Sequence, residues 1–209
     1  MPKKLDIYYS FRSPYSYLAI DRLIKIVEKY ALDYDFKIVR PLALREDNFF
    51  KNARPQFVPY LIRDVKREAD RLSIPFMVPT PDPIVMDMQT GIVAKDQPYI
   101  EQLMGLGMAA IESGNALLYA KQVGFAVWSS GQDWTRPDCL PDIAKGLGLD
   151  HAQLEAWRHD NADLIAARIH ENEKEQVLYH WGVPLMVLDG EPFFGQDRLD
   201  TLEWRLSQD

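Results

Sequence analysis

Three short segments of the sequence carry side chains that could bind or activate a small ligand. In the first, 11–17, Ser13 and Pro14 mark the expected start of a helix. Backbone N–H groups and the helix dipole make such a start favourable for an anion or a thiolate. Ser13 could donate a hydrogen bond there, or it could serve only as the helix cap. Because serine is not a redox group, we expect binding or polar catalysis at this position.

The second segment is Gly182-Val183-Pro184, directly before an expected strand. Cis peptide bonds occur mainly before proline, so we expect a cis bond between Val183 and Pro184. Such a bond would turn the N–H and C=O of Val183 outward, where they could pair with an extended peptide ligand. The alternative is a trans proline that merely opens the strand.

The third segment, 194–199, opens the last expected helix. Asp197 is expected to cap this helix, and the cap alone would explain an aspartate at this position. Its carboxylate could also bind the ammonium group of a ligand.

Both ends of the chain predict α/β structure. Alternating β-formers predict strands, and the spacing of apolar residues between the first two predicts a helix. Asp189-Gly190 predicts a hairpin turn between the last two strands. The expected elements are strands Leu5–Ser10, Tyr34–Arg40, Leu185–Leu188 and Glu191–Phe194, a helix 14–31 and a final helix from Asp197.

The middle of the chain predicts helices. A proline-rich stretch, 75–98, is expected to be an irregular loop. The expected helices are Pro59–Leu72, two within Tyr99–Trp128 that part near Gly114, Leu140–Leu147, His151–Arg158 and Asn161–His180. The fold class is therefore α/β: a small domain formed by 1–41 plus 181–209 and interrupted by a large all-helical insert, 42–180.

Composition excludes several classes of protein. The 209 residues include 24 Lys and Arg against 31 Asp and Glu, a net charge of −7, which argues against a nucleic-acid partner. Cys139 is the single cysteine, so the chain has neither an intrachain disulfide nor a CxxC pair. Since no apolar stretch reaches about 18 residues and the start MPKK lacks an apolar signal region, we expect a cytoplasmic protein with no membrane partner.

Together these features resemble the thioredoxin-like arrangement of the DsbA type. Redox members begin the first helix with a CxxC pair, and Ser13-Pro14-Tyr15-Ser16 stands in that place here. This segment looks like that of the kappa-class glutathione transferases and the 2-hydroxychromene-2-carboxylate isomerases. The resemblance covers nearly the whole chain and is densest at four segments, 13–18, 60–75, 182–184 and 194–199.

The resemblance implies glutathione as cofactor. Ser13 matches the catalytic serine that hydrogen-bonds the glutathione sulfur, and Val183 matches the residue that pairs with its cysteinyl backbone. Gln196 and Asp197 match the pair that holds the γ-glutamyl end. The remaining residues implied in glutathione binding are Pro14, Tyr15, Asn52 and Pro184.

The implied substrate is a small aromatic or electrophilic molecule, such as an arylidene-pyruvate. The thiolate would add to its conjugated double bond, allow rotation about the former double bond, and leave again. Arg12 and Lys51 are the candidate cations for the substrate carboxylate, although both could be solvated surface charges, and Tyr60 is a candidate substrate contact. The resemblance also implies a homodimer.

Three functions fit these residues. The first is a glutathione-dependent isomerase, and the second is a kappa-class-like glutathione transferase that releases a conjugate. The third is a non-catalytic thioredoxin-fold protein whose Val183-Pro184 edge binds a peptide from a partner. The pair Gln196-Asp197 favours the first two.

We do not expect the histidines or the single cysteine to form a functional site. The four histidines lack the spacing of metal ligands, so we expect no metal site. Cys139 is expected to be an ordinary buried thiol. We expect Trp181 in the core, while Trp128 and Trp134 could lie in the core or line a cleft.

Overall fold

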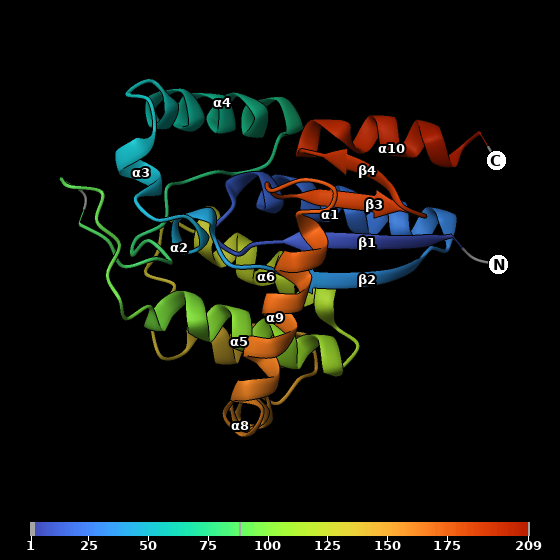
Figure 1. Cartoon of the computed structure of the whole chain (residues 1–209). Coiled ribbons are helices and arrows are strands. Elements are labelled where there is room, and N and C mark those ends of the chain that lie inside the picture. Colours follow the sequence, from blue (N-terminus) through green and yellow to red (C-terminus); the bar gives the residue numbers. More distant parts are fainter. Residues whose placement is uncertain (1–2, 88, 209) are drawn as a thin grey trace.

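Four strands form one mixed sheet in the computed structural model, which describes residues 3–87 and 89–208. Their order is β2-β1-β3-β4, with β1 parallel to β2 and antiparallel to β3, and β3 antiparallel to β4. The strands are β1 Lys4–Tyr9, β2 Asp33–Ile38, β3 Leu185–Leu188 and β4 Glu191–Phe194. The predicted parallel pair and the C-terminal hairpin are thus confirmed (Figure 1).

Helix α1 (Pro14–Tyr30) joins the two parallel strands and lies behind the sheet (Figure 1). Ser13 caps it as predicted, since its Oγ accepts from the N–H of Ser16 at 3.1 Å and Pro14 occupies the first turn. Its buried face includes Leu18 and Leu23, both fully buried. The start of α1 is therefore fixed by a local cap and by core packing together.

The segment between β2 and β3 consists of helices and loops in its described part, with one isolated bridge between Met86 and Val93. The expected break near Gly114 separates α5 from α6, and the described residues of the expected loop 75–98 form no helix before Pro98. Helix α9 ends at Gln176, four residues earlier than expected. The helices are α2 Leu42–Arg45, α3 Phe49–Asn52, α4 Phe57–Leu72, α5 Pro98–Glu112, α6 Ala116–Trp128, α7 Cys139–Gly146, α8 His151–Asp160 and α9 Ala162–Gln176.

These helices pack on the α/β elements rather than apart from them. Helices α9 and α5 both contact β2, with α9 in front of the strand ends and α5 below the sheet in Figure 1. Helices α6 and α4 contact α1. Trp128 and Trp134 are both buried, which settles their position in favour of the core. Trp181 is 56% exposed, so its prediction as a core residue is wrong. No helix within the described ranges has the length and apolar character needed to span a membrane.

The last helix begins later than expected. Residues Gln196–Arg198 form a 3₁₀ turn, and α10 runs over Leu199–Leu206 without a side-chain cap. Asp197 therefore does not cap the helix, and its carboxylate instead accepts from Arg198 Nη2 at 3.1 Å. The physical reason is that the 3₁₀ turn occupies the expected start, so that α10 begins two residues later than predicted, at Leu199.

Gly107 allows α5 to approach the strand ends closely, because a Cβ there would lie 2.7 Å from Phe11 Cε2 and 2.8 Å from Ile38 Cδ1. We expect Gly107→Ala to lower the free energy of unfolding by about 1–3 kcal/mol through overpacking. Gly146→Ala is the control, since no atom lies within 4 Å of its added methyl group, and we expect unchanged or slightly raised stability. Urea denaturation measures both, and equal stability of the two variants would contradict the close packing.

Candidate functional site

A pocket of about 230 Å³ lies where the start of α1 meets the segment before β3. Ser13 and Val183 face each other across it, and Ala43, Phe50 and Leu61 supply part of an apolar lining. It brings together five predicted site residues from the first two of the three segments: Arg12, Ser13, Pro14, Tyr15 and Val183. We name it the thiol pocket after the thiol that the resemblance implies beside Ser13.

Ser13 is half-buried, and its hydroxyl has one strong and one weak contact. Its Oγ accepts the cap bond from Ser16 and donates to the carbonyl of Val183 at 3.5 Å. That distance is longer than the usual range of about 2.5–3.0 Å for an O–H···O bond. Little is therefore lost when the hydroxyl proton turns toward another acceptor in the pocket.

Arg12 is paired with a loop residue far away in the sequence. Its Nε and Nη2 donate to the two carboxylate oxygens of Asp82 at 2.9 and 2.8 Å, and its guanidinium lies 5.2 Å from the ring centre of Phe50. Such a bidentate pair is stronger than a surface ion pair. The charge of Arg12 is thus compensated, and its predicted contact with a substrate carboxylate stays a prediction.

The Val183–Pro184 peptide bond is cis, as predicted. Among the described residues, no group accepts a hydrogen bond from the N–H of Val183, while its carbonyl receives the weak bond from Ser13. The N–H of Gly182 donates to His180 Nδ1 at 2.9 Å, and the His180 ring stacks on Phe194 with ring centres 3.7 Å apart. The backbone of this segment is therefore held on one side and open toward the pocket on the other.

Gln196 and Asp197 lie in the 3₁₀ turn after β4. Gln196 is 3% exposed; its Nε2 donates to Glu68 of α4 at 2.8 Å, and its Oε1 is buried with no hydrogen-bond partner in the described structure. Asp197 is exposed and contacts Arg198. Glu68 also pairs with Arg71, which holds the pKa of Glu68 below its usual value. Gln196 thus ties this turn to α4, and Asp197 gives the turn an exposed carboxylate.

Tyr15 points toward α4. Its hydroxyl donates to Asp64 Oδ2 at 2.6 Å, and burial, with the Asp64 hydrogen bond adding to it, raises the pKa of Tyr15 above its ordinary value. Tyr60 donates to the other oxygen of Asp64 at 3.3 Å and is 60% exposed. Tyr15 therefore stays protonated at neutral pH and helps to hold α4 beside α1.

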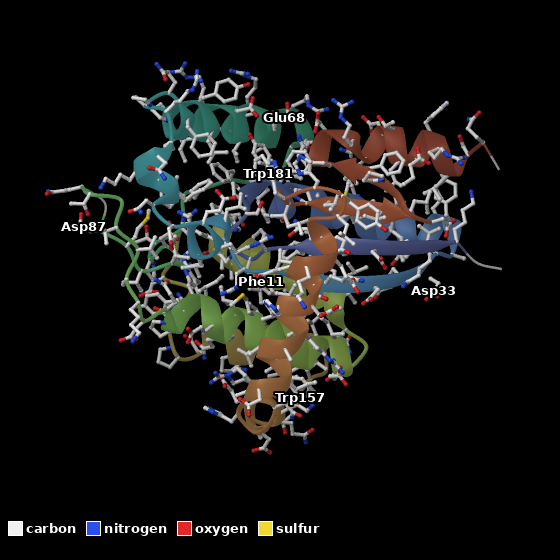
Figure 2. All side chains as sticks on the ribbon, in the orientation of Figure 1. Phe11, Asp33, Glu68, Asp87, Trp157 and Trp181 are labelled. Carbon is white, nitrogen blue, oxygen red and sulfur yellow. The ribbon has the colours of Figure 1, made fainter. Side chains whose placement is uncertain are left out.

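A wider pocket of about 700 Å³ adjoins the thiol pocket through shared lining residues, among them Phe57 and Trp181. Asn52 and Tyr60 line it, whereas Lys51 is exposed beside it in the sequence. Figure 2 places Trp181 between α4 and β3. This wide pocket is open, aromatic and connected to the position of Ser13.

Two residues that line the wide pocket, Trp181 and Arg54, were not predicted as site residues from the sequence. Trp181 forms a wall, because it stacks on His180 instead of entering the core. Arg54 lines the same pocket and has no ion-pair partner in the described part of the chain. A signal for Arg54 existed, since it lies only two residues from Asn52, but its charge alone did not separate it from other surface arginines.

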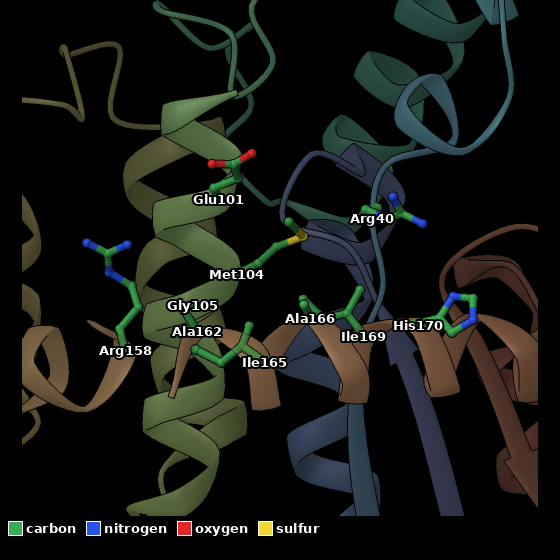
Figure 3. Close-up of a pocket in the computed structure, with 10 residues that line it drawn as sticks. All are labelled: Arg40, Glu101, Met104, Gly105, Arg158, Ala162, Ile165, Ala166, Ile169 and His170. Atoms are coloured by element: carbon green, nitrogen blue, oxygen red, sulfur yellow. The ribbon is translucent and has the colours of Figure 1, made fainter. Parts of the chain in front are cut away.

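A separate pocket of about 440 Å³ lies between α5, α8 and α9 (Figure 3). Its floor contains Met104, Ile165 and Ile169, and Arg40 lies on its rim. None of the predicted site residues lines it. Within the described residues no group of histidine, cysteine and acidic side chains has the arrangement of a metal site.

The family model for the DSBA-like thioredoxin domain matches residues 4–207. Over 209 aligned residues, the chain is 28% identical to a 2-hydroxychromene-2-carboxylate isomerase of Pseudomonas putida, covering 95% of this chain and 92% of that protein. It is 22% identical to glutathione S-transferase kappa 1 of Rattus norvegicus, covering 99% and 92%. A solved structure of a 2-hydroxychromene-2-carboxylate isomerase superposes with a TM-score of 0.71 at 25% identity, covering 98% of this chain and 95% of the other.

The contact between His180 and Gly182 predicts a titration below the ordinary histidine range. Nδ1 must be unprotonated to accept from Gly182, and burial lowers the pKa of His180 below 6.5. The neutral form is thus favoured in the folded state. The stability that it contributes is complete above pH 6.5 and is lost as the pH falls through the lowered pKa.

We expect NMR titration of the histidine Cε1 protons to show His180 titrating below pH 6.5, with the resonance assigned by its disappearance in His180→Gln. Titration of His180 at or above pH 6.5 would show that Gly182 is not bound to a neutral ring.

Proposed function

Since the chain belongs to the DSBA-like thioredoxin domain family, we propose that it is a glutathione-dependent isomerase of the 2-hydroxychromene-2-carboxylate type. The observation that carries the proposal is the hydroxyl of Ser13, which stands at the start of α1 opposite Val183 in the thiol pocket. A redox role does not fit a serine at this position. A role in binding the thiol of another molecule does.

The residues present fit glutathione. The open N–H of Val183 suits the peptide backbone of an extended tripeptide. The exposed carboxylate of Asp197 suits the ammonium group of a γ-glutamyl end, and Gln196 holds the turn that carries it beside α4. The apolar lining of the thiol pocket suits the cysteinyl side chain.

When bound, glutathione would supply a thiolate that can add reversibly to a conjugated double bond, so that rotation about the former double bond interconverts two isomers. Ser13 donates its hydroxyl proton in a hydrogen bond to the sulfur, and the N-terminal end of α1 adds a positive potential. Each unit by which the thiol pKa falls corresponds to about 1.4 kcal/mol of thiolate stabilisation. No proton is consumed overall, because the C–S bond that forms also breaks.

The substrate is proposed to bind in the wide pocket, where Trp181 and Phe57 offer aromatic surfaces. Arg54 and Lys51 are the cations proposed for its carboxylate, because neither has an ion-pair partner among the described residues. Arg12 would contact the substrate only by giving up its pair with Asp82.

A kappa-class-like glutathione transferase is the second candidate, supported by the similarity to the rat enzyme over 99% of this chain. It would use the same thiolate and release a conjugate. Mass spectrometry of the product separates the two, since an isomerase returns a product of unchanged mass. We retain the expectations of a cytoplasmic homodimer and of no nucleic-acid partner as parts of this proposal.

We expect Ser13→Ala to lower glutathione-dependent turnover of an arylidene-pyruvate by roughly 100-fold, the scale of losing one preorganised donor. The variant also loses the cap of α1, at a cost of about 1 kcal/mol. Asp150→Ala removes the matching cap of α8, where Asp150 accepts from Ala152 and Gln153, and serves as control. If turnover in Ser13→Ala falls no further than in Asp150→Ala, Ser13 is only a cap.

Calorimetric titration with reduced glutathione tests the binding site directly. We expect saturable binding to the wild type and about tenfold weaker binding to Asp197→Ala, because a charge-assisted contact with the ammonium group is lost. Asp163→Ala removes an exposed charge from the first turn of α9 and should bind normally. Absence of binding to the wild type at millimolar ligand would refute both enzyme functions and favour the peptide-binding alternative.

A further inference from the structure

The backbone of Gly182 is held by side chains at both of its polar groups. Its carbonyl accepts from Gln176 Nε2 at 2.8 Å, and its N–H donates to His180 Nδ1 at 2.9 Å. A Cβ at this position would lie 2.5 Å from Cε2 of Phe194, so any larger residue would have to displace the Phe194 ring. The residue directly before Val183 is therefore fixed by its surroundings and not by strand pairing.

Gln176 uses both ends of its amide. It is fully buried, and while its Nε2 holds Gly182, its Oε1 accepts from Arg45 Nη1 at 2.7 Å. Arg45 belongs to α2, which supplies Leu42 and Ala43 to the thiol pocket. One buried amide thus links the two segments that form opposite parts of the pocket wall.

Glu173, one turn before Gln176 on α9, holds the segment that leads into α2. Glu173 is 7% exposed and accepts from the Nε and Nη2 of Arg40 at 3.0 and 2.7 Å, and from its backbone N–H at 3.0 Å. The Nε of Arg45 lies 4.0 Å from the same carboxylate. Because Glu173 holds the chain just before α2, the amide of Gln176 meets Arg45 at a defined position.

We propose that Gln176 is a positioning residue for the thiol site, because its amide holds the Gly182 carbonyl and thereby sets the place of the Val183 backbone opposite Ser13. The inference rests on the proposed function, in which Val183 pairs with glutathione. Gln176 does not line the thiol pocket, so it acts through Gly182 and not by contact with a ligand.

Gln176→Glu tests this role with a side chain of nearly the same shape. A carboxylate beside Arg45 can still accept its hydrogen bond, but it cannot donate to the Gly182 carbonyl. Gln97→Glu is the matched control, because Gln97 is also buried and its Nε2 donates to the carbonyls of Val85 and Ala94 at 2.9 and 2.7 Å, away from the thiol pocket.

Two measurements are made on the full chain at neutral pH: amide hydrogen exchange of Gly182 by NMR, and the affinity for reduced glutathione by calorimetry. In Gln176→Glu we expect exchange at Gly182 to rise about tenfold while the amides of β1 and β2 are unchanged, and the Kd for glutathione to rise about tenfold. In Gln97→Glu both quantities should stay at their wild-type values.

The outcomes separate this inference from the proposed function. Unchanged exchange at Gly182, or an unchanged Kd despite faster exchange, would overturn the positioning role, as would an equal change in Gln97→Glu. If the wild type binds no glutathione, the proposed function is refuted, and the positioning role is judged from hydrogen exchange in Gln176→Glu. A rise confined to Gly182 supports the role, and no rise overturns it.

Arg45→Lys provides a second variant should Gln176→Glu not fold. Lysine keeps a positive charge near Glu173 but loses the guanidinium bond to Gln176. We expect the same two changes in the same direction and to a smaller extent. Wild-type exchange and affinity in this variant would show that the link from α2 to Gly182 does not position the site.

Discussion

The hydrogen bond from the Trp128 indole to the Phe11 carbonyl, 3.0 Å long, fixes the strand-to-helix turn on which the candidate site depends. Both residues are buried, so the carbonyl could not turn to water instead, and leaving it unpaired would cost about 1–3 kcal/mol. Trp128 is the last residue of α6, and Phe76 stacks on its ring. The helical part of the chain therefore holds the strand-to-helix turn before Ser13 in place.

The next two residues of that turn, Arg12 and Ser13, are also held by residues that lie far away in the sequence. Arg12 is bound by Asp82, 70 residues away, and Ser13 contacts the carbonyl of Val183, 170 residues away. Because these contacts come from different segments, the position of the Ser13 Oγ is established by folding and not by ligand. Such a preorganised donor loses little free energy to rearrangement when charge develops beside it. The site thus joins both parts of the chain, while the boundaries 1–41, 181–209 and 42–180 stay a prediction.

Local physical rules explain which features could be predicted from the sequence. The cap by Ser13 and the cis bond before Pro184 depend on neighbouring residues, and the structure contains both. Trp181 and Asp197 could not be placed in this way. The exposure of Trp181 results from its stacking on His180, and the 3₁₀ turn at Asp197 displaces the helix start. In the same way Asp82, the partner of Arg12, lies in a loop without periodic pattern, so the compensation of the Arg12 charge could not be predicted.

That compensation constrains the electrostatics beside Ser13. With Arg12 bound to Asp82 in a bidentate pair, the positive potential left at the turn comes mainly from the N–H groups at the start of α1. This potential falls off within the first helical turn, so it acts on an atom placed at Ser13 and hardly at all on a group further out. A second anionic group of a bound ligand would therefore need another cation. Arg54 offers one in the wide pocket, beyond the residues Phe57 and Trp181 that line both pockets. In the proposed function, these charges favour a single anionic atom near Ser13, an aromatic body against Trp181 and a carboxylate toward Arg54.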